Sequence, residues 1–293
     1  MLLCTLMRKF LRIFVFSLLT LIILGAVGIG LFIYKAKYGF PIYETEAPPL
    51  PDNLEGFSVL VFSKTNGFRH GEAINASLPA LKKMADDNNW SMFQTDNGAV
   101  FRIDYLAEFD VVIWNNASGP VLNGEQKSAF RNYIESGGGF VGIHAAGDDS
   151  HQWNWYEDEL IGAHFSHHPL DPHIQESNLT LEPDSNNLSL RIGLLADWKR
   201  SDEWYVFYDN PRLNRKDILY NLDEDGLVMS GNMGFLIKDK NYGMGDDHPI
   251  VWYGSVGEGR SFYSALGHTG ESFSEKNHLL LLKNAILWAG KAR

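Results

Sequence analysis

One apolar segment near the N-terminus limits what this chain can fold into. Residues 13–34 carry no charged side chain and consist mainly of Leu, Ile, Val, Phe and small residues. A helix needs about 20 such residues to cross a bilayer, so we expect a transmembrane anchor here. Three basic residues precede the segment and two follow it, which favours a cytoplasmic N-terminus. The expected order is a cytoplasmic tail (1–12), a single-pass anchor (13–34) and a domain on the extracytoplasmic side.

A cleaved signal peptide is the alternative interpretation of the same segment. Its apolar core would span about 7–15 residues and end at a small-residue cleavage site. The present segment is longer and runs directly into Ile33-Tyr34-Lys35, which favours an uncleaved anchor. Cys4 lies before the segment and is the only cysteine. Intramolecular disulfides are therefore excluded, and the exported domain must be stable through its core alone.

The charge of the remaining chain excludes one class of partner. The first 37 residues carry five basic and no acidic side chains, so the total of −11 leaves −16 on residues 38–293. Such a domain repels phosphate backbones, and we expect no nucleic-acid partner. Four prolines between residues 41 and 51 predict an extended tether over 35–55. Residues 56–291 suit one large α/β domain.

Strands and helices alternate through the first half of this domain. Strands are expected at 57–62, 90–94, 109–114 and 140–143, and helices at 72–88 and at 123–136, where Asn123 is the expected N-cap. This alternation predicts a parallel sheet flanked by helices. The loops 64–71, 115–122 and 144–156 should then emerge at one edge of the sheet.

The second half is less regular. Strand-like runs occur at 190–195, 204–207 and 218–222. A hairpin is expected from 249–253 and 260–266, followed by a helix over 275–289.

Three histidines follow strands of the predicted sheet: His70, His144 and His268. Histidine exchanges protons near neutral pH, so a group of them at one sheet edge points to acid–base chemistry. The alternative is that each histidine only caps a loop. His144 stands out because it follows Phe140-Val141-Gly142-Ile143 in a sharp Gly/Ala turn.

Two further clusters could contribute to a site. Asp202 and Glu203 precede Trp204-Tyr205, and because neighbouring residues of a strand face opposite ways, we expect only one carboxylate in the cleft. A solvated turn is the alternative. Trp155 belongs to the aromatic run 153–156, which could stack on a sugar or fill the core.

A third group is the histidine-rich segment 164–173. Its spacing matches no established zinc motif, so we expect loop histidines there, with neither a bound metal nor a cofactor.

Taken together, these pieces resemble the ThuA-like (trehalose utilisation) family. They occur in the family order over about residues 56–290: Phe68-Arg69-His70, Gly142-Ile143-His144-Ala145-Ala146, Gly162-Ala163-His164-Phe165, His168-Pro169, Asp202-Glu203-Trp204-Tyr205, His248-Pro249-Ile250-Val251-Trp252, Gly259-Arg260-Ser261-Phe262-Tyr263 and Leu266-Gly267-His268-Thr269. The resemblance implies a flavodoxin-like fold, similar to class I glutamine amidotransferases.

The resemblance also shapes the expected chemistry. In amidotransferases the central turn carries a nucleophilic cysteine, whereas here that position is His144 and the late histidine corresponds to His268. Glutamine hydrolysis by a thiol is excluded, because Cys4 precedes the apolar segment. The family implies carbohydrate metabolism, with a trehalose-like disaccharide or its keto form as substrate and a sugar oxidoreductase as a pathway partner.

Three functions follow from these observations. The first is a membrane-anchored, sugar-acting hydrolase or lyase. His144, His268 and Glu203 would be its catalytic residues, and the substrate would be bound by Arg69, His70, Trp155, Asp202 and Tyr205. The second is a non-catalytic sugar-binding module on a tether. The third is a metal-dependent hydrolase built from the histidines.

Overall fold

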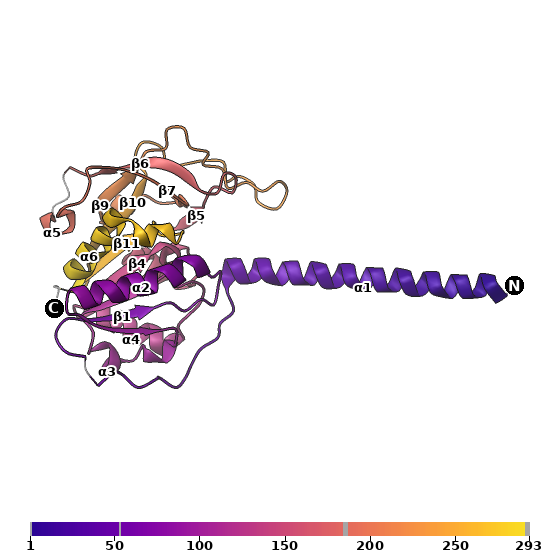
Figure 1. Ribbon diagram of the computed structural model, residues 1–293, viewed down its shortest axis with the longest axis horizontal. Helices are drawn as coiled ribbons and strands as arrows, with labels where there is room; N and C mark the ends of the chain where they lie inside the picture. The colour runs from indigo at the N-terminus through magenta and orange to yellow at the C-terminus, as the bar shows by residue number, and fades with distance from the viewer. Residues whose placement is uncertain (1, 53, 184–186, 291–293) are drawn as a thin grey trace.

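The structure is a computed structural model that describes residues 2–52, 54–183 and 187–290. The N-terminal apolar segment forms one long helix, α1 (Leu2–Tyr38), which stands clear of the remaining molecule (Figure 1). Its part Leu6–Tyr38 is long and apolar enough to cross a membrane. This length and composition suit either a membrane anchor or a signal sequence. The expected anchor, 13–34, lies inside this helix, which also includes the described part of the expected tail.

The segment after α1 packs against the domain instead of standing away from it as a free tether. The ammonium group of Lys64 is buried and therefore needs acceptors. It donates to the carbonyl oxygen of Ile42 at 2.6 Å and forms an ion pair with Glu44. The same carboxylate accepts the N–H of Gly98 at 2.8 Å. Residues 35–38 of the expected tether belong to α1, and residues 53 and 291 lie outside the described part of the chain.

A nine-stranded sheet in the order β2-β1-β3-β4-β11-β10-β9-β6-β7 forms the centre of the domain. Its first five strands run parallel, as the alternation of strands and helices predicts. They are short and apolar, and four of them are almost wholly buried, as expected where helices cover both faces. These strands are β1 (Ser58–Phe62), β2 (Ser91–Thr95), β3 (Val111–Asn115), β4 (Gly139–Ile143) and β11 (Gly259–Ser264).

The other four strands extend the sheet in antiparallel order: β10 (Pro249–Val256), β9 (Asp217–Leu222), β6 (Gln175–Leu181) and β7 (Asp197–Asp202). The predicted hairpin is therefore present. The strand expected at 190–195 is wrong, because the chain forms a short helix, α5 (Leu188–Arg191), and then turns at Gly193 with φ +72°. A separate two-stranded sheet pairs β5 (Phe165–His167) with β8 (Val206–Phe207).

Helices cover both faces of the parallel half: α2 (Gly71–Asp87), α3 (Ile103–Leu106), α4 (Gly124–Glu135) and α6 (Lys276–Gly290). Asn123 caps α4 as expected. Its side chain accepts the N–H of Gln126, and the Gln126 side chain accepts the N–H of Asn123, which is a capping box. Short helical turns complete the domain: η1 (Gly98–Val100), η2 (His144–Gly147), the π-helical η3 (Tyr156–Ile161), η4 (Pro211–Asn214) and η5 (Glu271–Ser274).

Candidate active site

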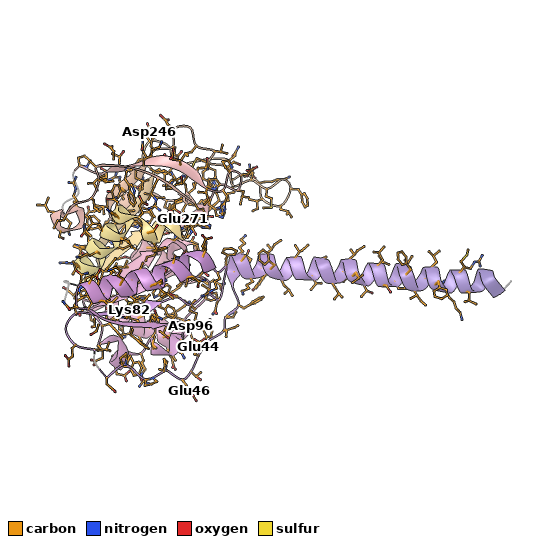
Figure 2. The ribbon with its side chains drawn as sticks, in the orientation of Figure 1. Glu44, Glu46, Lys82, Asp96, Asp246 and Glu271 are labelled. Atoms are coloured by element: carbon orange, nitrogen blue, oxygen red, sulfur yellow. The ribbon has the colours of Figure 1, made fainter. Side chains whose placement is uncertain are left out.

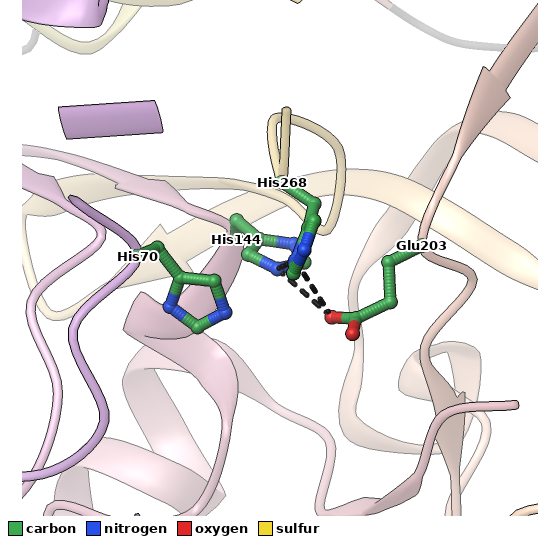
Figure 3. A group of neighbouring side chains, drawn as sticks. All are labelled: His70, His144, Glu203 and His268. Carbon is green, nitrogen blue, oxygen red and sulfur yellow. Dashed lines mark hydrogen bonds and ion pairs between the residues drawn. The ribbon is translucent and has the colours of Figure 1, made fainter. Parts of the chain in front are cut away.

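Three histidines expected at the sheet edge meet in one cluster. Nε2 of His144 lies 3.1 Å from Nδ1 of His268. The ring of His70 lies edge-on to both, with ring centroids 4.8 and 4.9 Å away. Figure 3 shows the rings of His144 and His268 next to each other, with His70 beside them. The carboxyl ends of the parallel strands thus bring together residues far apart in the sequence.

The turn after β4 fixes the orientation of His144. Its φ of +49° is in the left-handed region, which a residue other than glycine seldom adopts. The carbonyl oxygen of His144 accepts the hydroxyl of Tyr263 at 2.8 Å, and Nδ1 lies 2.7 Å from the carbonyl oxygen of Ala265. Because a carbonyl only accepts, Nδ1 carries a proton and Nε2 is the atom presented to the cluster.

Glu203 completes the cluster from the far edge of the sheet. Its Oε2 lies 3.1 Å from Nε2 of His144 and 3.2 Å from Nδ1 of His268 (Figure 3). Glu203 directly follows β7, and four strands lie between β7 and β4 in the sheet order. In a flat sheet these two strands would be about 24 Å apart. The antiparallel half must therefore curl over the edge of the parallel half, which closes the site.

Asp202 supports the site from behind and does not line it. Its carboxylate is fully buried and accepts the backbone N–H groups of Glu203, Gly267 and His268 at 2.9–3.1 Å. It also pairs with Arg200 at 2.8 Å. These four donors occupy the carboxylate, so the expected contact of Asp202 with substrate hydroxyls is not supported. The expectation that only one carboxylate of this pair faces the cleft agrees with the geometry.

The charges in the cluster depend on one another. Burial opposes charge on both His144 and Glu203, but the Glu203 contact still raises the pKa of His144. Contacts with His144, His173 and His268 hold the pKa of Glu203 well below its usual range, against the effect of burial. Burial, reinforced by the nearby His144, lowers the pKa of His70 to about 2. The site is therefore a carboxylate–imidazole pair beside a neutral imidazole.

The histidines of the segment 164–173 lie in two separate places. His173 and His168 contact the other carboxylate oxygen of Glu203, His168 at 3.1 Å, so both belong to the cluster. His164 instead lies between Asp149 and Asp158, at 3.0 and 2.9 Å. Sequence reasoning missed the contribution of His168 and His173. The only signal was the density of histidines in this one segment.

Within the part of the chain that the structure describes, three groups of side chains have the spacing needed to hold a metal ion. One is His70, His144, Glu203 and His268, whose ligand atoms all lie within 4.8 Å of one another. The others are His168 with His173 and Glu203, and Asp149 with Glu157 and His164. Two of the three groups share Glu203.

The remaining expected site residues lie at differing distances from the cluster. Tyr205 is buried and forms a wall, with its ring centroid 4.4 Å from that of His144. Arg69 is exposed and donates to the Thr65 hydroxyl at 3.3 Å, outside the cluster. Trp155 lines a cleft of about 960 Å³ with Gly257 and Arg131. Gly257 is in the β10–β11 turn, at the opposite end of the sheet, so a substrate contact of Trp155 in this site is not supported.

A family model described as "Trehalose utilisation", ThuA, matches residues 58–289. The chain belongs to the ThuA family. This membership supports a carbohydrate-related role and confirms the family expected from the sequence. No curated protein sequence matches the chain.

Solved structures of ThuA-like proteins agree with this assignment. A putative ThuA-like protein from Bacteroides uniformis is 25% identical, with a TM-score of 0.66 over 83% of this chain and 95% of that one. A putative ThuA-like protein from Parabacteroides merdae shares the fold at 18% identity, with a TM-score of 0.57 over 80% of this chain and 90% of that one. The expected parallel sheet flanked by helices is confirmed, and its antiparallel extension is an addition.

Proposed function

We propose that this ThuA-family chain is a membrane-anchored enzyme that acts on a trehalose-like disaccharide or its keto form, as a hydrolase or lyase. The convergence of His144, His268 and Glu203 at the carboxyl edge of the sheet carries this proposal. Such an edge is where open α/β sheets bind their ligands. The family description supplies the substrate class. Helix α1 would anchor the domain at the membrane, with the site on the extracytoplasmic side.

The roles of the three residues follow from their surroundings. His144 is held by Ala265 and paired with Glu203, so it is suited to take a proton from the substrate. The side chain of His268 is 19% exposed, more than those of His144 and Glu203, so it is suited to return a proton to the leaving oxygen. His70 and Tyr205 form the walls of the site, and Arg69 would reach the substrate at its exposed rim.

A keto-sugar substrate would have to come from another enzyme. A sugar oxidoreductase is the class of reaction that introduces a ketone into a disaccharide, and it would be the pathway partner of this protein. A ketone acidifies the neighbouring C–H bond, so that a histidine base can remove its proton. Lyase chemistry would follow on the keto form, and hydrolysis on the unmodified disaccharide.

The test is turnover by the purified full chain in detergent or lipid nanodiscs. Trehalose, related disaccharides and their enzymatically oxidised keto forms are incubated with the wild type and with His144→Asn, and products are identified by mass spectrometry. Asn tolerates the left-handed backbone of residue 144 better than Ala does. The expected result is product from the wild type only, with closely similar melting temperatures. Sugar binding in calorimetry without product from any substrate would instead identify a binding module.

A further inference from the structure

Two buried polar atoms of the cluster, Oε2 of Glu203 and Nδ1 of His70, have no hydrogen-bond partner among the described residues. Among the described residues, none donates to Oε2 of Glu203 with hydrogen-bonding geometry, although two imidazole nitrogens lie 3.1 and 3.2 Å away. Nε2 of His144 is an acceptor too, because Nδ1 donates to Ala265. A proton on Nδ1 of His268 would satisfy only one of these two atoms. A buried carboxylate oxygen in this position calls for a cation.

The three atoms have the separations of metal ligands. His144 Nε2, His268 Nδ1 and Glu203 Oε2 form a triangle with sides of 3.1, 3.1 and 3.2 Å. Zn²⁺ binds nitrogen at about 2.0–2.1 Å and carboxylate oxygen at about 2.0–2.2 Å in tetrahedral geometry, which separates two ligands by about 3.4 Å. An ion above the triangle would reach all three atoms with shifts of a few tenths of an ångström.

The surrounding contacts hold these ligands as metal sites require. The second ring nitrogen of His144 donates to a backbone carbonyl, which presents Nε2 to the ion. The second oxygen of Glu203 is held by His173, so Oε2 remains directed at the two imidazoles. Asp202 binds the backbone N–H groups of Glu203 and His268 and thereby fixes both ligands. Each ligand thus has a partner that orients it.

We propose that His144, His268 and Glu203 bind one divalent transition-metal ion, of the Zn²⁺ class, and leave a fourth position open on the side of His70. Two imidazoles and one carboxylate suit zinc, and catalytic zinc sites combine three protein ligands with an open position. The open position would take a water molecule or a sugar oxygen. This inference rests on the proposed function for the identity of the sugar. It replaces the proton-transfer roles given there to His144 and His268, because Nε2 of His144 and Nδ1 of His268 would hold the ion.

The test measures metal directly, without substrate. The full-length protein is stripped with a chelator, dialysed against Zn²⁺ or Co²⁺, and measured by mass spectrometry of the metal and by the visible spectrum of bound Co²⁺. The variants are His268→Gln and Glu203→Gln, with near-ultraviolet circular dichroism to confirm folding. His164→Gln is the matched control, because it removes a histidine from the separate Asp149–Glu157–His164 group.

The expected result is one ion per wild-type chain with the Co²⁺ spectrum of a four-coordinate site. Both ligand variants should bind at least about 100-fold more weakly, whereas His164→Gln should bind as the wild type does. No saturable binding by the wild type, or loss of the ion in His164→Gln alone, would overturn the metal centre. A protein that binds the ion but transforms no sugar would refute the proposed function and leave the centre intact. Turnover in the presence of chelator would refute the metal centre and leave the proposed function intact.

A different observation carries a second inference, about the membrane. The loop 231–240 ends in a tight turn closed by a bridge between Met233 and Ile237. The side chains at its tip are apolar and exposed: Met233, Phe235, Leu236 and Ile237, with Phe235 82% exposed. Figure 1 shows this loop, in orange, projecting from the body in the direction of α1. Exposed apolar residues gathered at one loop tip mark an interaction site.

Two observations connect this loop to the end of α1. Lys240, at the base of the loop, lies over the ring of Tyr208 at 3.9 Å from its centroid. The Lys240 contact lowers the pKa of Tyr208, and the charge of Lys37, in the last turn of α1, contributes to the same shift. The charge of Lys37 thus acts on the same tyrosine that Lys240 contacts. Lys238 adds a further positive charge beside the apolar tip, and Asp239, between the two lysines, offsets one of these two charges.

We infer that the tip Met233–Ile237 enters the lipid interface as a second membrane contact, with Lys238 and Lys240 at the level of the headgroups. Apolar side chains flanked by lysines are typical of segments that bind anionic lipid surfaces. Two attachment points, α1 and this loop, would fix how the domain faces the bilayer. This inference rests on α1 being an uncleaved anchor.

Fluorescence of the full chain in vesicles containing anionic lipid tests this contact. In a Cys4→Ser background, an environment-sensitive dye is attached to Phe235→Cys or to the control Leu188→Cys. Leu188 is 78% exposed and belongs to α5, at the end of the body away from α1 (Figure 1). The dye at 235 should be quenched by lipid-borne quenchers and protected from aqueous iodide, and the dye at 188 should behave oppositely. Equal iodide access at both sites would overturn the loop contact. Failure of the chain to float with the vesicles would overturn the anchor on which the contact rests.

Discussion

Nε2 of His144 lies 3.1 Å from Oε2 of Glu203, although the two residues belong to opposite halves of the central sheet. The pair exists because the antiparallel extension curls back over the carboxyl edge of the parallel strands. The parallel half supplies the three histidines, and the extension supplies the carboxylate. Figure 2 shows the two halves as one continuous body, from which α1 projects.

Replacing Asp202 should disturb the positions of the site residues, although Asp202 itself does not contact the substrate. Asp202→Asn leaves the buried Arg200 guanidinium with Glu275, at 3.2 Å, as its remaining charged partner, and weakens the hold on the loop of His268. Breaking a buried ion pair typically costs about 3–5 kcal/mol. Because Glu275 still pairs with Arg200, we expect a loss below the upper end of this range in chemical denaturation, together with reduced turnover. Asp197→Asn, at an exposed position of the same strand, is the control and should change stability by less than about 0.5 kcal/mol.

Gly147 permits the close approach of Tyr263 to the turn that holds His144. A Cβ at this position would lie 2.5 Å from the Tyr263 ring, whose hydroxyl donates to the His144 carbonyl. Gly147→Ala should therefore destabilise the protein by about 1–3 kcal/mol and lower kcat/KM. Gly124→Ala offers the matched comparison, because nothing lies within 4 Å of the new methyl group. Thermal melting should show stabilisation there, by about 0.4–1 kcal/mol, and an equal loss in both variants would contradict this account of Gly147.

Acid should destabilise the domain partly through His278. This side chain is fully buried, and burial together with the nearby Arg200 lowers its pKa to about 3. The unfolded chain has an ordinary histidine pKa of about 6.5. Between these values the unfolded state binds a proton that the folded state does not, so stability falls as pH falls from about 6.5. The stability of His278→Gln should depend less steeply on pH than that of the wild type, by up to about 1.4 kcal/mol per pH unit. Parallel denaturation curves for the two proteins from pH 7 to 4 would show that His278 does not titrate in this way.

Substitution of Trp155 should show that the cleft at the other end of the sheet takes no part in catalysis. Trp155 packs beneath Arg131 there, with the guanidinium 5.4 Å from the ring centroid. Trp155→Phe should leave kcat/KM for the sugar within about twofold, since the histidine cluster does not contact it. Steady-state kinetics measure this directly. A loss comparable to that of a cluster variant would place substrate at this end of the sheet.

Local sequence patterns were sufficient to predict the parallel half of the domain. Asn123 begins a helix because its side chain satisfies free N–H groups, and this depends only on nearby residues. The short apolar strands before His70, His144 and His268 end at the same sheet edge because parallel strands have their carboxyl ends at one edge of a sheet.

The antiparallel half could not be predicted in the same way. In β6 and β7 the buried positions include polar side chains such as Gln175, Ser177, Arg200 and Asp202, so hydrophobic periodicity does not reveal the strands. The contact of His173 with Glu203 depends on how this half curls over the site. Such long-range packing is not encoded in the spacing of either residue along the chain.

A double-mutant cycle on His144 and Glu203 tests the central claim most directly. Product formation from the preferred sugar is measured for the wild type, His144→Asn, Glu203→Gln and the double variant. If the two residues form one chemical unit, each single change should lower kcat/KM by about 10²–10⁴-fold, and the double variant should be no worse than the poorer single variant. Losses that multiply in the double variant would show that His144 and Glu203 act independently, and would contradict the account.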